Sequence, residues 1–164
     1  MQFLKDKKSI ITGAGSGIGK AIALLFAEKG SHVILLDRDE DGGKSVANDI
    51  VAAGGKATFF ACDVSKQKEI IDLFNQLAPF DILVNNAGIG ILGKVADLSI
   101  EELELITKTN YFGMIYCTKA ILNSMLKSIN KTNKQKKCIS VAAAMRDGNL
   151  SVSNEIDYLG FAIE

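Results

Sequence analysis

The chain has 164 residues, 48% of them hydrophobic, and its 19 lysines and arginines balance its 19 aspartates and glutamates. This length and composition suit one globular domain and exclude disorder throughout, and the charge balance argues against a surface dedicated to nucleic acid or membrane. No apolar stretch approaches the ~18 residues of a membrane span, and the N-terminal segment is too polar for a signal peptide. We therefore expect a cytoplasmic protein.

The strand-like runs are the continuous apolar segments 9–12, 32–37, 56–62, 81–86 and a last one that ends at Ser140. The segments with helical patterns are 17–29, 40–53, 65–78 and 99–128. In the first helix Ile18, Ile22, Leu25 and Phe26 recur at near-helical spacing. Apolar strands that alternate with helices predict an α/β fold, a doubly wound parallel sheet of about five strands with helices on both faces.

Local signals set the ends of the later helices. Ser65 is expected to cap the third helix, and Pro79 to end it. The Ser-x-x-Glu sequence at 99–102 is a capping box that opens the fourth helix, in which Gly113 is a weak point. The polar, lysine-rich stretch 127–137 that follows is expected to be a solvated loop.

Cysteine and histidine usage gives no sign of a metal site. The cysteines Cys62, Cys117 and Cys138 are widely spaced, as is typical of reduced, buried thiols. Because His32 is the single histidine and no Cys-x-x-Cys motif exists, we expect no metal ligands. His32 is expected simply to begin a strand.

Glycines gather between the first predicted strand and the first predicted helix, at Gly13, Gly15, Gly17 and Gly19. Glycine permits tight turns and close approach of the main chain, and the free N–H groups at a helix start attract phosphate. We therefore expect the pyrophosphate of a dinucleotide over Gly13–Gly19. A glycine turn that serves packing alone is the alternative.

An acidic residue is expected about 20 residues further on, at the end of the second strand, and Asp37 stands there. A carboxylate accepts hydrogen bonds from both ribose hydroxyls and repels a 2′-phosphate, which favours NAD over NADP. Arg38 follows directly and is expected to soften that preference. In the alternative interpretation, Asp37 is a solvated carboxylate at the end of a strand.

Four motifs occur in a fixed order along the chain: Thr12-Gly13-x-x-x-Gly17-x-Gly19, Cys62-Asp63-Val64, Asn85-Asn86-Ala87-Gly88, and Asn110 within TKTNYFG. With these motifs the chain resembles the short-chain dehydrogenase/reductase family over roughly residues 5–144. The resemblance implies a Rossmann-type fold, a nicotinamide dinucleotide cofactor and hydride transfer between the nicotinamide and an alcohol or ketone.

The resemblance also implies a set of site residues. The implied cofactor-binding residues are Thr12, Gly13, Gly15, Ser16, Gly17, Ile18, Gly19, Asp37, Asp63, Val64, Asn85, Ala87 and Gly88. Asp63 would accept a hydrogen bond from the adenine amino group, and Val64 would offer its main-chain N–H. In the active site, Asn110 would hold a water for proton relay by its side chain or its carbonyl, and Ser140 would contact the substrate oxygen.

The family's acid/base is a tyrosine with a lysine four residues later, and this pair is absent. Tyr111, Tyr116 and Tyr158 are followed at that distance by Ile115, Ala120 and Ala162. In the family's register Ser153 and Asp157 occupy the two positions. An anion in place of the lysine would raise the pKa of a neighbouring phenol instead of lowering it.

After Ala144 the sequence no longer follows the family pattern. We therefore expect a dinucleotide-binding Rossmann domain at 1–144, with 145–164 a divergent tail of the same domain, in a chain that is truncated or frame-shifted there. The functional hypotheses are an NAD-linked oxidoreductase for a small hydroxyl or carbonyl substrate, a non-catalytic dinucleotide-binding or interaction module, and a truncated product. The 99–128 helix is expected either to pack only within the core or also to pair with a second copy.

Overall fold

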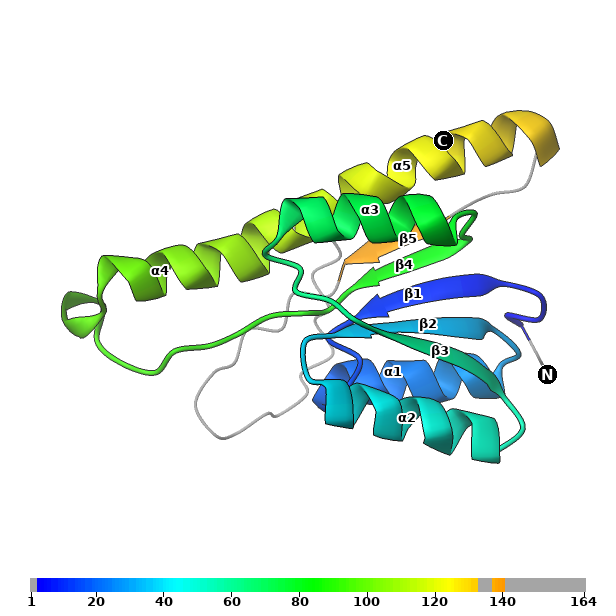
Figure 1. Ribbon diagram of the computed structural model, residues 1–164, viewed down its shortest axis with the longest axis horizontal. Helices are drawn as coiled ribbons and strands as arrows, with labels where there is room; N and C mark the ends of the chain where they lie inside the picture. The colour runs from blue at the N-terminus through cyan, green and yellow to red at the C-terminus, as the bar shows by residue number, and fades with distance from the viewer. Residues whose placement is uncertain (1–2, 133–136, 141–164) are drawn as a thin grey trace.

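The computed structural model describes residues 3–132 and 137–140, with side chains described for 3–94 and 96–122. A parallel sheet lies between two layers of helices (Figure 1). The elements in chain order are β1 (Lys8–Thr12), α1 (Gly17–Glu28), β2 (His32–Asp37), α2 (Glu40–Ala52), β3 (Lys56–Ala61), α3 (Gln67–Leu77), β4 (Ile82–Asn85), the 3₁₀ turn η1 (Val95–Asp97), α4 (Ile100–Thr107), the π-helical turn η2 (Lys108–Phe112), α5 (Gly113–Thr132) and β5 (Lys137–Ser140).

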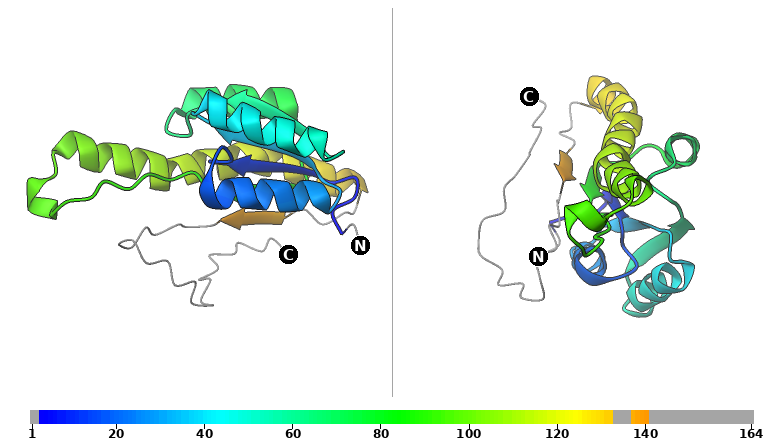
Figure 2. Two further views of the ribbon diagram at one scale, coloured as in Figure 1. Left: turned by 90° about the horizontal axis from the view of Figure 1, so that it is seen from below. Right: turned by 90° about the vertical axis from the view of Figure 1, so that its left-hand side faces the viewer.

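The sheet has five strands in the order β3-β2-β1-β4-β5, and all neighbours are parallel. The chain adds β2 and β3 on one side of β1 and then returns through α3 to place β4 on the other side, so the switch point of the sheet lies between β1 and β4. Helices α1 and α2 cover one face, and α3 and α5 cover the other (Figures 1 and 2). The predicted α/β fold class is confirmed.

Each face of the sheet carries its own hydrophobic core, because successive side chains of a strand point to opposite faces. In β1, Ile10 packs with the α3 and α5 side, whereas Ile11 packs with the α1 and α2 side. In β2, Ile34 belongs to the first core and Leu35 to the second. Strands buried on both faces explain why these segments are continuously apolar.

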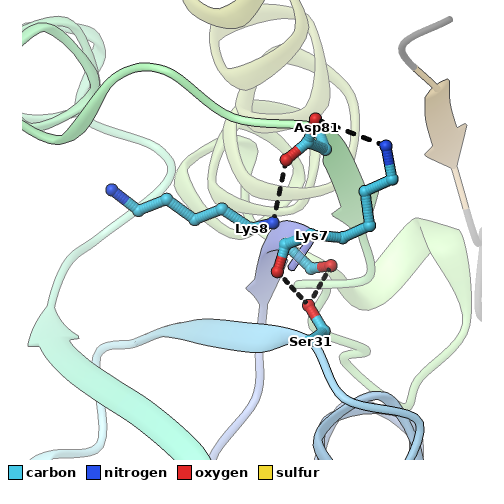
Figure 3. Close-up of polar contacts among 5 residues, drawn as sticks. Lys7, Lys8, Ser31 and Asp81 are labelled. Atoms are coloured by element: carbon cyan, nitrogen blue, oxygen red, sulfur yellow. Dashed lines mark hydrogen bonds and ion pairs between the residues drawn. The ribbon is translucent and has the colours of Figure 1, made fainter. Parts of the chain in front are cut away.

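Polar contacts join the strands at the amino edge of the sheet (Figure 3). The main-chain N–H of Lys8 donates to Oδ2 of Asp81 at 3.0 Å, and Nζ of Lys7 lies 3.8 Å from Oδ1 of the same carboxylate. The Ser31 hydroxyl donates to the carbonyl of Lys7 at 3.0 Å. These contacts fix the starts of β1, β2 and β4 at the edge opposite the ends of the strands.

Helix α1 buries small residues at its contact with the sheet. Gly19, Ala23 and Ala27 are buried, whereas Ile18 and Leu25 are 45% and 49% exposed. Ile22 and Phe26, from the same apolar set, are partly buried against the core. The small residues allow α1 to approach the sheet closely.

The capping box of α4 is confirmed, since the Ser99 hydroxyl and the Glu102 side chain each accept from the other residue's main-chain N–H. The cap predicted for α3 is wrong: Lys66 is its N-cap, and the Ser65 hydroxyl binds Asp63 instead. Helix α3 ends at Leu77, before a cis Ala78–Pro79 bond.

The long helix predicted at 99–128 is three segments in line, α4, η2 and α5. Its irregularity is the π turn over Lys108–Phe112, which ends just before Gly113. Helix α5 continues to Thr132, so the prediction of a loop that begins at residue 127 was wrong. Residues 133–136 of that stretch lie outside the described residues. Helix α4 projects beyond the carboxyl edge of the sheet (Figures 1 and 2).

Candidate functional site

The candidate site lies at the carboxyl edge of the sheet, where parallel strands deliver their last residues together. Asp37 pairs in register with Ala61, two residues before Asp63, and Asn85 pairs with Ser140. Thr12 ends β1 between these two pairs. The register therefore brings the ends of all five strands, and the predicted residues on them, to one edge.

The glycine loop between β1 and α1 is packed too closely for side chains. Gly13 and Gly17 have φ of +65° and +51°, a conformation that favours glycine. A Cβ on Gly13 would lie 2.8 Å from Cα of Ala87, and one on Gly19 would overlap the carbonyl oxygen of Gly13. The loop therefore needs glycine for its conformation and for its contacts with the segment after β4.

The amino end of α1 is open. Ser16 is the N-cap but makes no side-chain cap hydrogen bond, and no acidic residue stands in the first turn. Ser16, Gly17 and Ile18 are exposed. Because the first N–H groups of a helix lack helical partners and carry partial positive charge, this end suits an anion.

Asn86 joins the glycine loop to the end of β4, a role that the sequence analysis missed. Its side-chain Nδ2 donates to the carbonyls of Thr12 and Gly13 at 3.0 and 3.1 Å. The Thr12 hydroxyl accepts from the main-chain N–H groups of Asn86 and Ala87, both at 3.0 Å. The Asn-Asn-Ala-Gly tetrapeptide was the available signal, but we assigned only its other three residues.

The Asp37 carboxylate is held by main-chain donors on both sides. Its Oδ2 accepts from the N–H of Gly15 at 2.8 Å, and its Oδ1 accepts from the N–H of Asp39 at 2.9 Å. A Cβ on Gly15 would lie 3.0 Å from Oδ2 of Asp37. Asp37 is therefore not simply a solvated carboxylate, because it is attached to the glycine loop.

The turn after β3 presents Asp63 and Val64. Oδ1 of Asp63 accepts from the N–H and the hydroxyl of Ser65 at 2.9 and 2.7 Å. Val64 is buried, and a Cβ on Gly113 would lie 2.8 Å from its side chain. Cys62 is also buried; burial, with the charges of Glu69 and Asp63, raises the pKa of its thiol to about 11.

Two asparagines brace the other half of the edge. Asn85 is 5% exposed, and its Nδ2 donates to the Thr118 hydroxyl of α5 at 3.0 Å. Asn110, inside the π turn, accepts from the N–H of Ile89 and donates to the carbonyl of Ile89, both at 2.8 Å. Both ends of the Asn110 amide are thus occupied by the loop after β4, next to Gly88.

Several predicted positions cannot be placed at this site. Ser140 ends β5 opposite Asn85 in the register, but its side chain lies outside the described residues, as does that of Cys138. Ser153, Asp157, Tyr158 and the whole of 145–164 lie outside the described part of the chain. Among the described tyrosines, Tyr111 is 56% exposed on the π turn.

The described residues contain neither a helix long and apolar enough to cross a membrane nor a group of three potential metal ligands.

A five-stranded parallel sheet with a glycine loop at its switch point, an open helix start and an acidic residue at the end of β2 is the architecture of a dinucleotide-binding Rossmann protein. The family model for "short chain dehydrogenase" matches residues 7–143. The chain belongs to the short-chain dehydrogenase family, whose members are oxidoreductases that bind a nicotinamide dinucleotide.

Individual relatives agree with this assignment. An uncharacterized oxidoreductase of Staphylococcus aureus is 36% identical over 130 residues, which are 77% of this chain and 55% of the relative. One of Thermotoga maritima is 34% identical over 97% of this chain and 68% of its own length. A solved 7α-hydroxysteroid dehydrogenase, complexed with NADH and 7-oxo glycochenodeoxycholic acid, has a TM-score of 0.76 and 32% identity over 84% of this chain and 53% of its own. The chain thus spans little more than half of the first and last of these proteins.

Proposed function

We propose that the chain binds NAD at the carboxyl edge of its sheet, with the pyrophosphate on Gly13–Gly19 and the adenosine ribose on Asp37. The observation that carries the proposal is the 2.8 Å hydrogen bond from the Gly15 N–H to the Asp37 carboxylate. It joins the glycine loop, called the phosphate loop from here on because it is proposed to hold the pyrophosphate, to the residue proposed to bind the ribose. A carboxylate has about four acceptor directions. Asp37, with two main-chain donors, keeps the capacity to accept from both ribose hydroxyls.

The preference for NAD over NADP is supported by local charge. Asp37, Asp39, Glu40 and Asp41 stand within five residues, and a 2′-phosphate on the ribose would meet this negative charge. Arg38 is exposed in the same segment and is the one cation there. The proposal therefore keeps NAD as the cofactor, with Arg38 reducing the discrimination against NADP.

The remaining cofactor positions follow the edge outward from Asp37. We assign the adenine to Asp63 and Val64, and the path towards the nicotinamide to Thr12, Ala87 and Gly88. The assignment is supported by the close packing of the glycine loop against the segment after β4, since Gly13 and Gly19 leave no room for a Cβ beside Asn86 and Ala87. Asn85 remains in the proposal as a structural residue, because its amide is bound to Thr118.

For chemistry, we propose hydride transfer between NAD and a small alcohol or ketone, with the bound nicotinamide supplying the hydride acceptor or donor. The side chain of Asn110 binds Ile89 at both ends, so a proton-relay water is assigned to its main-chain carbonyl in the π turn, where regular helical bonding is interrupted. Ser140 is assigned to the substrate oxygen. Domain limits of 1–144 and 145–164 remain part of the proposal.

The absence of a Tyr-x-x-x-Lys pair from the sequence favours a second candidate, a dinucleotide-binding module that does not turn over. Losing a general acid/base lowers a rate by about 10²–10⁴-fold. Binding and turnover are therefore separate questions for this chain. The two candidates share the nucleotide site and differ only in the reaction.

Two measurements on the full chain test the proposal. Calorimetric titration with NADH and NADPH should show saturable binding that is tighter for NADH, and Asp37→Ala should weaken NADH more than NADPH. Absence of heat and of any thermal shift with either nucleotide would remove both candidates. Oxidation of NADH with a panel of small ketones then decides between them: ordinary dehydrogenase turnover supports the oxidoreductase, and binding without turnover supports the module.

We also propose that a second copy of the chain packs on the α4–η2–α5 helix. Leu105, Tyr111 and Phe112 are 43%, 56% and 39% exposed along it, and exposed apolar groups of this kind mark interaction surfaces. Light scattering should report a dimer or larger species. A monomer at high concentration would contradict this part of the proposal.

A further inference from the structure

Two adjacent glycines, Gly42 and Gly43, stand in the first turns of α2. In a helix, glycine is less favourable than alanine by about 1 kcal/mol per residue. Neither glycine has a positive φ, so neither is required by backbone conformation. Their presence calls for a different reason, which lies in what their missing side chains allow to approach.

The absence of a side chain on Gly43 allows a residue of β3 to pack against the start of α2. The ring of Phe59 occupies the space where a Cβ of Gly43 would stand, with ring Cζ at 2.7 Å from that position. Gly43 is buried, and Phe59 is partly buried in the core beneath α1 and α2. A side chain on Gly43 would therefore push the start of α2 away from the sheet.

The same turn of α2 lies against the phosphate loop. A Cβ on Gly42 would be 3.1 Å from the carbonyl oxygen of Gly15, and a Cβ on Gly15 would be 3.1 Å from the main-chain nitrogen of Gly43. Three glycines from two segments thus meet main chain to main chain. The position of the α2 start sets how closely the phosphate loop approaches β2.

Asp37 bridges these two segments. One carboxylate oxygen accepts from Gly15 in the phosphate loop, and the other accepts from Asp39. Asp39 in turn is the N-cap of α2, and its Oδ1 accepts from the N–H of Gly42 at 3.2 Å. The orientation of the Asp37 carboxylate is therefore determined by the same packing that Gly42 and Gly43 permit.

We propose that Gly42 and Gly43 are positioning residues for the ribose subsite, which set the selectivity for NADH over NADPH by seating α2 against the phosphate loop and Phe59. The inference rests on the proposed function, because it takes Asp37 as the ribose ligand. The glycines touch no cofactor themselves. They act through the direction in which the Asp37 oxygens face the two ribose hydroxyls.

The test measures the affinities of the full chain for NADH and NADPH by titration, with thermal unfolding as a separate readout. Gly43→Ala should lower the ratio of NADH to NADPH affinity by about tenfold, the effect of losing one hydrogen bond to a charged group. Gly55→Ala is the matched control, because its Cβ would also crowd a neighbour, Ile50 at 2.8 Å, but beyond the other end of α2. It should lower stability and leave the ratio unchanged.

Relief of the crowding provides the rescue. Phe59→Ala should restore the affinity ratio of Gly43→Ala in the double variant, because the ring is what the new Cβ meets. Gly42→Ala is a milder variant, in which the side chain of Asp39 can move aside but the Gly15 carbonyl cannot; a smaller fall in the ratio, about threefold, is expected. If Gly43→Ala does not fold, the affinity ratio of Gly42→Ala tests the positioning role instead.

The outcomes separate the two proposals. A wild-type chain that binds neither nucleotide overturns the proposed function, and the positioning role with it. A wild-type chain that prefers NADH, together with glycine variants that keep that preference, overturns the positioning role alone. A fall in the ratio for Gly55→Ala as large as that for Gly43→Ala would likewise overturn it, since general destabilisation would then suffice.

Discussion

The two halves of the carboxyl edge are built differently. On the proposed nucleotide side, formed by the ends of β1, β2 and β3, glycine main chains pack closely together and Asp37 joins the glycine loop to β2. On the proposed reaction side, formed by the ends of β4 and β5 and the π turn, the side-chain amides of Asn85 and Asn110 bind neighbouring segments. The supporting structure is present on both sides, but the family's Tyr/Lys pair is absent from the sequence.

This difference indicates that the residues that shape a site are not the residues that carry out its chemistry. The shape depends on many close contacts spread over several elements, such as Gly13 against Ala87 and Gly113 against Val64. Proton transfer depends on two side chains, which the fold does not need. The contacts that shape the proposed nucleotide site can therefore be present whether or not the groups for proton transfer stand beside it.

The largest effect should come from filling the nucleotide side. Gly19→Val places side-chain atoms where the Gly13 carbonyl stands, so we expect the free energy of unfolding to fall by about 3 kcal/mol or more and NADH binding to be lost. Denaturant unfolding and titration measure the two effects. Gly54→Ala is the control outside the site, because its φ of +82° is also positive and its Cβ meets nothing within 4 Å, so it adds only backbone strain. A Gly19→Val chain that binds NADH normally would contradict the assignment of the glycine loop to the nucleotide.

The next effect tests the reaction side. Asn110→Ala removes two hydrogen bonds to Ile89, so we expect the free energy of unfolding to fall by about 1–2 kcal/mol. The affinity for NADH should change less than about threefold, because the glycine loop and Asp37 are untouched. Asn110→Asp keeps the acceptor for the Ile89 N–H and should be intermediate in stability. A large loss of NADH affinity in Asn110→Ala would show that the two sides are not separable.

Much of this architecture was predictable from sequence because its signals are local. The strand β2 begins and ends where its apolar run does, His32–Asp37, and the Ser99 capping box needs only four residues. The glycine loop and Asp37 could be placed because parallel strands deliver their ends to one edge. These features depend on the chain's immediate neighbourhood or on the topology alone.

What could not be predicted depends on contacts between distant segments. Asn86 binds Thr12 and Gly13, more than 70 residues away, and nothing near it in the sequence distinguishes it from Asn85. In α1 the buried residues are Gly19, Ala23 and Ala27, whereas Ile18 and Leu25 are exposed, a difference that apolar periodicity does not predict. Asn110, inside the π turn, likewise pairs with Ile89 across the loop after β4, a contact between segments 21 residues apart.

A smaller effect is expected away from both sides, at the start of α4. Ser99→Ala removes the hydroxyl that accepts from the Glu102 N–H, and loss of such a cap costs about 1 kcal/mol. Denaturant unfolding should show this loss while NADH affinity stays unchanged, because α4 projects beyond the sheet (Figure 1). Ser99→Asp restores a capping acceptor and should recover most of the stability. An equal loss in both variants would mean that the hydroxyl packs and does not cap.

The smallest effect concerns pH and the opposite edge of the sheet, where His32 Nε2 lies 3.0 Å from the Thr58 hydroxyl. Burial, with the charges of Lys8 and Lys56, lowers the pKa of His32 below 6.5. The unfolded chain therefore binds this proton more readily than the folded chain, and the stability that neutral His32 contributes is lost as pH falls below about 6.5. In His32→Gln that contribution is absent, so the wild type should lose more stability than the variant between pH 7.5 and 5. A stability difference between the two chains that stays constant over this range would contradict the assignment. NADH affinity should be the same in both at each pH, because His32 begins β2 and Asp37 ends it.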